Sequence, residues 1–271
     1  MYVLYTFPMK IISYALWGNN PRYIDPLLEN IKVAEQLFPD WKVVVYISNS
    51  TRKEVKDELK SLGASVYECG ESPDTRGAFW RFRAFSLPDV DVVIIRDADS
   101  ALTGRDKSMV DHWLASGRDF YLCRDHPCHV RPIICCSWGA KGKGIEKIRN
   151  IADYDPGYSN YGDDEKFLAQ FVYLKYRKEF LVFAPFLLYR GEKNEEFNLR
   201  RHDKTDYIGR IASKEGCSED AAMEVLWNIS CPVPARRWLI PYSQSWNLIH
   251  WLARNVIRKK SVQKWRDFSV K

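Results

Sequence analysis

Two aspartates, Asp97 and Asp99, come directly after the apolar segment 90–95 and are the residues best suited to chemistry in this chain. Two carboxylates that flank one residue of a turn can hold a divalent cation such as Mn2+ or Mg2+, and that cation can bridge the oxygens of a diphosphate. In an open α/β sheet, ligands bind beyond the carboxyl ends of the strands. We therefore predict a metal and diphosphate site here, against the simpler alternative of a solvated turn that caps the next helix.

Phosphatases with an aspartyl nucleophile also carry two aspartates at this spacing. In that class an aspartate of the motif is the nucleophile that attacks the phosphate. The motif is expected on the first strand, with Thr or Val two residues later. Here the motif follows the fourth predicted strand, and Ala101 stands in that later position. We therefore discount the phosphatase interpretation.

The elements that must position Asp97 and Asp99 alternate between strands and helices. We expect strands at 10–17, 42–47, 65–69 and 90–95, and helices at 21–38 and 51–62. Repeated strand–helix units predict a Rossmann-like α/β fold, with a mostly parallel sheet covered by helices on both faces.

The second half of the chain continues the pattern less regularly. We expect helices at 105–116 and 163–175, and strands at 119–123 and 180–186. The glycine-rich segment 139–144 lacks the Gly-Lys-Ser/Thr ending of a P-loop, so we predict a mobile loop near the acceptor instead.

Several blocks of this sequence resemble those of one enzyme group. In chain order they are Phe79-Trp-Arg-Phe82, Arg96-Asp-Ala-Asp-Ser100, Cys123-Arg-Asp-His-Pro127 and Tyr161-Gly-Asp-Asp-Glu-Lys-Phe-Leu168. They resemble blocks of bacterial and large algal virus polysaccharide glycosyltransferases of the GT-A fold, over roughly residues 10–175. Glu165 stands where that group has Gln, and Cys123 where it has Met. The resemblance implies a GT-A fold, a nucleoside diphosphate sugar donor (UDP by family habit), Mn2+ or Mg2+, and a glycan or glycoprotein acceptor, such as a capsid glycan on the viral side.

The donor site is expected to draw on the end of the first strand. Tyr14, Ala15 and Trp17 are positioned there to hold the nucleobase and ribose, as the resemblance also implies. Tyr14 and Trp17 have the equal alternative of being core aromatics.

Arginines next to the aromatic block are candidates for the diphosphate. On an α-helix, positions 76, 80 and 83 share one face, so Arg76 and Arg83 are predicted to approach the diphosphate together, assisting Asp97. The alternative is that they form surface salt bridges.

The catalytic base is predicted to be a carboxylate near the start of the helix at 163–175. Of Asp163 and Asp164, one is expected to cap the helix and the other to deprotonate an acceptor hydroxyl. Asp164 matches the family block and is preferred, and Asp125 remains the rival.

His202 is a candidate third metal ligand beside Asp97 and Asp99, because GT-A enzymes often complete the site from a late loop. A lone histidine in a polar loop is more often solvated. Cys123, His126, Cys128 and His129 also suggest zinc, but their spacing places ligands on opposite faces of a short strand.

The positive charge of the chain is local. The total is +6, yet residues 236–271 alone carry nine Lys or Arg and one acid, which leaves a charge of −2 on residues 1–235. A nearly neutral body argues against nucleic acid as a partner. A helix expected at 245–258 has an apolar arc between Trp246 and Trp251, so it either packs on the domain or lies peripherally on an anionic membrane.

Composition and segment lengths bear on compartment and domains. Seven cysteines suggest reduced thiols, and neither a membrane span nor a secretory signal is expected, so we predict a cytoplasmic protein, in the host cytoplasm if it is viral.

We expect a transferase domain at 1–235, with a donor half at about 10–100 and an acceptor half at 101–235. A basic extension would follow at 236–271.

Two other functions stay open from the sequence. A nucleotidyltransferase shares the sheet and the metal carboxylates, but it favours a glycine-rich basic loop after the first strand, which segment 16–21 lacks. A non-catalytic carbohydrate- or membrane-binding protein on a transferase scaffold is the alternative from outside the enzymes.

Overall fold

A mixed seven-stranded sheet with the order β3-β2-β1-β4-β6-β5-β7 forms the centre of the molecule. The computed structural model of the 271-residue chain describes residues 9–72, 74–126, 129–153, 160–203 and 205–212, and the backbone of 238–240. The strands are β1 (Met9–Leu16), β2 (Trp41–Ile47), β3 (Ser65–Glu68), β4 (Val90–Ile95), β5 (Phe120–Cys123), β6 (Trp138–Lys141) and β7 (Phe180–Phe183). Within this sheet, β6 is antiparallel to both of its neighbours and the other pairs are parallel.

Helices cover both faces of the sheet, as the alternating pattern predicts. The α-helices are α1 (Pro21–Leu37), α2 (Lys53–Ser61), α3 (Gly104–Ala115), α4 (Lys143–Ile148), α5 (Asp163–Leu168) and α6 (Leu174–Tyr176). The 3-10 helices are η1 (Thr75–Ser86), η2 (Arg149–Asp153) and η4 (Arg177–Glu179), and η3 (Ala169–Tyr173) is a π-helical turn between α5 and α6. Two further strands, β8 (Leu187–Tyr189) and β9 (Trp238–Ile240), pair in parallel with each other.

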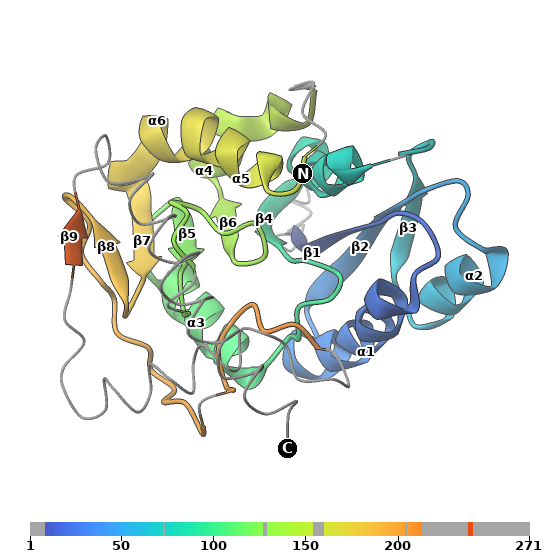
Figure 1. The fold of residues 1–271 in the computed structure, drawn as a ribbon, viewed down its shortest axis with the longest axis horizontal. Helices are drawn as coiled ribbons and strands as arrows, with labels where there is room; N and C mark the ends of the chain where they lie inside the picture. The colour runs from blue at the N-terminus through green and yellow to red at the C-terminus, as the bar shows by residue number, and fades with distance from the viewer. Residues whose placement is uncertain are drawn as a thin grey trace, which may run out of the picture.

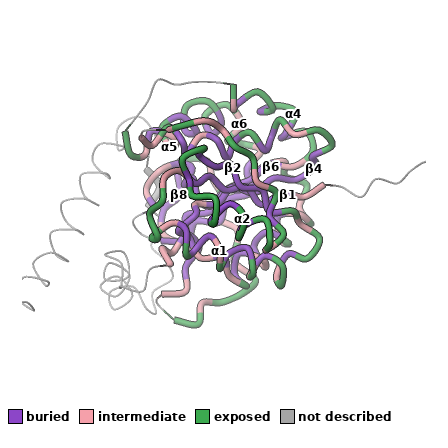
Figure 2. The backbone as a smooth tube through the Cα atoms, turned by 90° about the vertical axis from the view of Figure 1, so that its right-hand side faces the viewer, coloured by how far each residue is buried: buried purple, intermediate pink, exposed green. Residues whose placement is uncertain are grey.

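Two apolar cores lie on opposite sides of the sheet. One core joins the strands to α1, α2 and α3, and the other joins them to η1, α4 and α5. Figure 1 shows α1 and α3 on one side of the strands and α4 to α6 on the other. The buried stretches of chain gather in the interior, where the strands run (Figure 2). The three-layer α/β arrangement predicted from the sequence is therefore confirmed.

The glycine-rich segment 139–144 is not the loop that we predicted. Gly139 lies in β6, between β4 and β5, and a Cβ at this position would lie 2.5 Å from the Val93 carbonyl oxygen and 2.7 Å from the Tyr121 ring. Only glycine allows the three strands to approach so closely. Gly142 then precedes the first residue of α4.

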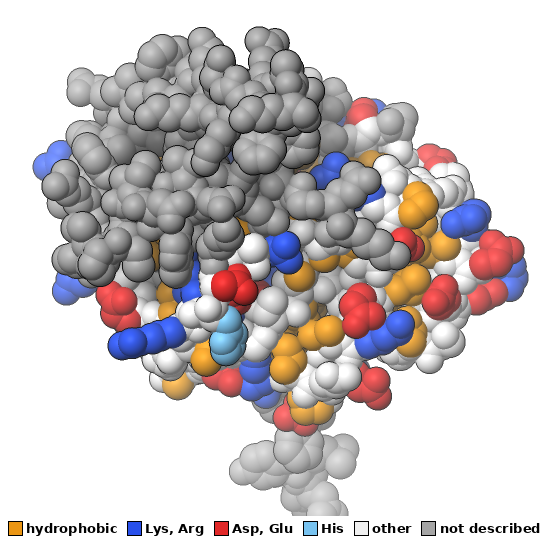
Figure 3. All heavy atoms as spheres, turned by 60° about the horizontal axis from the view of Figure 1, so that its bottom comes forward, with side chains coloured by type: hydrophobic (Ala, Val, Ile, Leu, Met, Phe, Trp, Pro, Cys, Tyr) orange, Lys and Arg blue, Asp and Glu red, His pale blue; other side chains and the backbone are white. Residues whose placement is uncertain are grey.

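The charge on one face of the molecule is consistent with the prediction that residues 1–235 are nearly neutral. Acidic and basic side chains are interspersed over the described part of the face in Figure 3, without a broad region of one sign. Within the described residues, no helix is both long enough and apolar enough to cross a membrane. The helix predicted at 245–258 lies outside the described residues, and β9 falls at the start of the predicted extension.

Candidate functional site

Asp97 and Asp99 lie in the loop that follows β4, where the sequence places them. Asn30 of α1 holds this loop from one side, because its side-chain amide donates to the Ser100 carbonyl at 2.8 Å and accepts from the Leu102 amide at 2.8 Å. The Asp97 side chain is 36% exposed and that of Asp99 is 12% exposed. Both carboxylates therefore reach the surface from a backbone that is fixed by hydrogen bonds.

Arg81 of η1 connects Asp97 to Asp164 at the start of α5. One guanidinium nitrogen of Arg81 donates to Asp97, and the other donates to Asp164 at 2.6 Å. The second oxygen of Asp164 accepts from the Glu165 amide at 2.9 Å. Because the Arg81 side chain is only 5% exposed, this is a sheltered ion pair in which one cation serves two acids.

The carboxylates outnumber the cations at this site. Burial and the charge of Asp97 raise the pKa of Asp99 to about 6. Burial and the charge of Asp164 raise the pKa of Glu165 to about 8, although Arg131 lies 3.3 Å away and opposes the shift. A site that disfavours its own negative charge in this way is suited to binding a cation.

The donor atoms of Asp97 and Asp99 fit Mn2+ or Mg2+. Such ions are commonly held by one or two carboxylates and take further ligands from water and the phosphates of the substrate. No group of three or more His, Cys, Asp or Glu side chains suited to a metal occurs among the described residues. Among the described residues, Asp97 and Asp99 therefore stay the candidate ligands for such an ion.

Arg22, near the start of α1, is a cation of the site that the sequence reasoning missed. Its guanidinium lies 3.6 Å from the Asp99 carboxylate, and its side chain is 54% exposed. The guanidinium also lies 5.5 Å from the centre of the Tyr23 ring. It is thus placed beside Asp99 with about half of its side chain exposed to solvent.

Arg76 and Arg83, the arginines predicted to bind diphosphate, are both exposed and have contacts with residues other than Asp97 and Asp99. Arg76 is exposed and bonds Asp74 at the start of η1, whereas Arg83 is exposed and lies near Cys69 and Tyr46. The prediction assumed 3.6 residues per turn, but η1 is a 3-10 helix with about 3. At that period, positions 78, 81 and 84 share the buried face, which is why Arg81 reaches the acids.

The three residues predicted to hold the nucleobase and ribose are largely part of the core. Tyr14 has no exposed surface, and burial raises the pKa of its hydroxyl above the usual value. Ala15 is 5% exposed in the opposite core. Trp17 is partly buried and packs on Gly77, where a Cβ would lie 2.8 Å from the indole. Of the three, only Trp17 has surface left to contact a ligand.

Asp163 and Asp125 are more buried than Asp164, whose side chain is 13% exposed. Asp163 accepts from the Asn160 amide at 2.9 Å and from Lys166 at 2.6 Å, but it is not the predicted cap, because Gly162 precedes the first turn of α5 and no side chain caps it. Asp125 has no exposed surface, and its carboxylate accepts four hydrogen bonds. Asp164 bonds Arg81 and the Glu165 amide but keeps more exposed surface than Asp163 or Asp125, so it stays the preferred candidate base.

His202 does not join Asp97 and Asp99 in a cluster of ligands. It is exposed, and its backbone amide donates to Asp206 at 3.0 Å. A histidine in a polar loop is solvated more often than it binds a metal. Cys128 of the zinc alternative lies outside the described residues.

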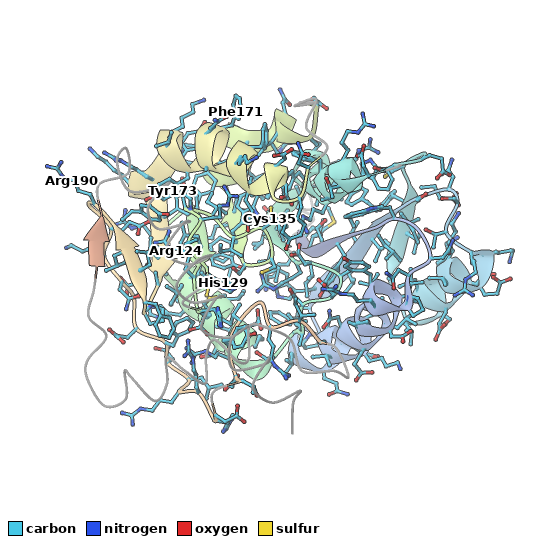
Figure 4. The ribbon with its side chains drawn as sticks, in the orientation of Figure 1. Arg124, His129, Cys135, Phe171, Tyr173 and Arg190 are labelled. Atoms are coloured by element: carbon cyan, nitrogen blue, oxygen red, sulfur yellow. The ribbon has the colours of Figure 1, made fainter. Side chains whose placement is uncertain are left out.

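The vicinal cysteines Cys135 and Cys136 lie in the interior. Cys135, labelled near the middle of Figure 4, is 3% exposed, and Cys136 is 4% exposed. Burial raises the pKa of both thiols well above the usual value. Neither is suited to act as a nucleophile, because the thiolate is the reactive form.

No family model and no curated protein matches the sequence. Part of the chain is similar in structure to a mannosyltransferase from Pyrobaculum calidifontis in complex with GDP-Man and Mn2+. The TM-score is 0.38 and the identity 17%, and the match covers 53% of this chain but only 47% of that protein.

Two other similar structures are matched over more of their own length. A glycosyltransferase involved in glycosylation of the major capsid of PBCV-1 matches with a TM-score of 0.42 and 13% identity, over 67% of this chain and 84% of that one. A putative glucose-1-phosphate thymidylyltransferase from Bacillus anthracis matches with a TM-score of 0.45 and 12% identity, over 65% and 86%. With every score below 0.5, these likenesses do not by themselves assign a function to the chain.

Proposed function

We propose that this chain is a metal-dependent glycosyltransferase of the GT-A fold. It would move a sugar from a nucleoside diphosphate donor, with UDP as the first candidate, to a hydroxyl of a glycan or glycoprotein. The observation that carries the proposal is the junction of Asp97, Arg81 and Asp164 beyond the carboxyl end of β4, with Asp99 two residues away.

The charged groups at this junction would stabilise a diphosphate leaving group. Mn2+ or Mg2+ held by Asp97 and Asp99 would stabilise the negative charge that develops on the leaving group. Arg22 is exposed beside Asp99 and would contact the phosphate oxygens, because a guanidinium fork matches them in shape and charge. Arg81 holds the carboxylates of Asp97 and Asp164 apart and in fixed directions.

Asp164 is the residue proposed to accept the proton of the acceptor hydroxyl. A carboxylate has about four acceptor positions, and two of those of Asp164 are used by Arg81 and by the Glu165 amide. We expect the acceptor hydroxyl to bond one of the remaining positions, to give its proton to the carboxylate and then to attack the sugar.

The remaining parts of the proposal come from the sequence. We propose that residues 1–235 form the transferase domain and that the basic extension 236–271 makes any peripheral membrane contact, with the protein working in the cytoplasm. Removing the extension should change acceptor or membrane association and leave donor binding intact.

Binding and hydrolysis of the donor test the proposal. Calorimetry with UDP and Mn2+ should show metal-dependent binding that Asp99→Ala abolishes, whereas Asp111→Ala, on the exposed face of α3, should bind as wild type does. Hydrolysis of a panel of UDP- and GDP-sugars should then identify the donor. Binding that is independent of metal or unaffected by Asp99→Ala would refute the transferase, and release of pyrophosphate from a nucleoside triphosphate and a sugar phosphate would indicate a nucleotidyltransferase instead.

A further inference from the structure

The loop that carries Asp97 and Asp99 is held from a second side by a late segment, residues 205–212, which we call the strap. The Ala101 amide donates to the Arg210 carbonyl at 2.9 Å, and the Ala212 amide donates to the Asp99 carbonyl at 2.7 Å. Ser100 and Ile211 form an antiparallel bridge between these bonds. The backbone of one predicted metal ligand is thus bonded directly to the strap.

The strap is fastened to the rest of the molecule at Asp125. This carboxylate follows β5 and accepts from the Ile208 amide of the strap at 3.1 Å. It also accepts from Arg105 at 2.9 and 3.2 Å and from Arg201 at 2.5 Å. Arg201 additionally donates to the Asp125 carbonyl at 2.5 Å.

Arg105 extends the same attachment. It lies in α3, the helix that follows the Asp97–Asp99 loop, and it donates to the Leu199 carbonyl. Its guanidinium also lies 3.8 Å from the centre of the Phe197 ring. Asp125 therefore joins three parts of the chain: the start of α3, the segment around Leu199 to Arg201, and the strap.

We propose that Asp125 is a positioning residue of the metal site, which fixes the backbone of Asp99 by fastening the strap against the Asp97–Asp99 loop. The inference rests on the proposed function for the identity of the metal ligands. Asp125 has no exposed surface, so the role proposed for it is exerted through the residues that it bonds. Its effect passes through the Ile208 amide to the two backbone hydrogen bonds that the strap makes with Ala101 and Asp99.

A comparison of two buried acids in the full-length chain tests the proposal. Asp125→Asn weakens the attachment of the strap, and Glu192→Gln is the matched control. Glu192 is equally sheltered and bonds Arg124, Tyr173 and the Tyr189 amide, away from the strap. Both variants should lose stability in urea unfolding, because each leaves a buried arginine without its charged partner.

The decisive readouts are Mn2+ affinity in the presence of UDP and amide hydrogen exchange at Ala101 and Ala212. We expect Asp125→Asn to bind Mn2+ at least about 10-fold more weakly and to lose protection at both amides, since a misplaced ligand loses metal affinity by about 10- to 100-fold. Glu192→Gln should change neither. Arg201→Gln, which removes only part of the attachment, gives a milder variant with the same signature if Asp125→Asn does not fold.

Three results would decide against the inference or its premise. Wild-type Mn2+ affinity with unchanged exchange in Asp125→Asn would overturn it, and so would an equal loss of affinity in Glu192→Gln. Failure of the wild-type protein to bind Mn2+ would contradict the proposed function instead. In that case, exchange at Ala101 and Ala212 would still decide whether Asp125 holds the loop.

Discussion

Arg81 of η1 donates to Asp164 of α5 at 2.6 Å, although the two residues are 83 positions apart in the sequence. The same guanidinium bonds Asp97. A lysine at position 81 keeps the charge but cannot reach both acids, because one ammonium replaces a fork of donors.

We therefore predict that Arg81→Lys lowers the rate of donor hydrolysis by at least about 10-fold while the protein remains folded, since a charge-assisted hydrogen bond contributes about 1.5–3 kcal/mol. Arg81→Met, which leaves two acids facing each other, should cost about 3 kcal/mol of unfolding free energy. Urea unfolding and donor hydrolysis measure the two effects. Arg83→Lys, at an exposed position of the same helix, should match wild type.

A second prediction concerns Arg22 and the diphosphate. Arg22→Gln should weaken UDP binding in Mn2+ by about 10-fold or more, because an exposed guanidinium next to the metal ligands loses its charged bond to phosphate. The salt dependence of binding should fall as well. Lys32→Gln, on an exposed turn of the same helix, is the control in calorimetry. Equal affinities for Arg22→Gln and wild type would remove Arg22 from the donor site.

Glu165 gives a prediction about pH. Burial and the charge of Asp164 raise its pKa from the ordinary 4.5 to about 8, so the folded protein holds this proton more tightly than the unfolded chain does. The stability from this group is fully present below about pH 4.5 and is lost as the pH rises towards 8, by at most about 1.4 kcal/mol per pH unit.

Glu165→Gln removes this titration. In urea unfolding without metal, we expect its unfolding free energy to fall less steeply between pH 5 and 8 than that of wild type. Glu146→Gln, at an exposed position of α4, should keep the wild-type slope. Parallel pH profiles for wild type and Glu165→Gln would show that Glu165 titrates normally.

The close approach of strands at Gly139 gives a prediction about stability. Gly139→Ala would push a methyl group to 2.5 Å from the Val93 carbonyl, and we expect a loss of about 1–3 kcal/mol from this overpacking. Gly117→Ala is the control, because a Cβ there has open space. Thermal unfolding of both variants measures the difference, and equal melting temperatures would show that β4 and β6 can separate at little cost.

The sequence predicts those parts of the fold that depend on local periodicity. The strands β1, β2 and β4 and the helices α1 and α3 lie within a residue or two of the predicted ranges, because each has a clear apolar pattern and defined ends. The place of Asp97 and Asp99 just after β4 follows from the same pattern, while their role as metal ligands stays a prediction.

The missed features depend on contacts that spacing does not reveal. The sequence does not single out Arg81, because the same residue types can form a 3-10 helix or an α-helix. Only the period differs, and the period decides which side chains share a face. The role of Asp125 depends on Arg105, Arg201 and the Ile208 amide, which come from three distant segments. The strand β6 was missed because its glycine is there for close packing, while glycines in a sequence usually indicate loops.

The position of β6 also sets the order in which the chain can become stable. β4 gains its second neighbour only when β6 arrives, after β5 in the sequence. A nascent chain that has completed β4 therefore carries an apolar strand edge without a partner until residue 141 has been synthesised. The donor half at about 10–100, produced alone, would keep that edge permanently, so truncation there should yield aggregates rather than a nucleotide-binding fragment.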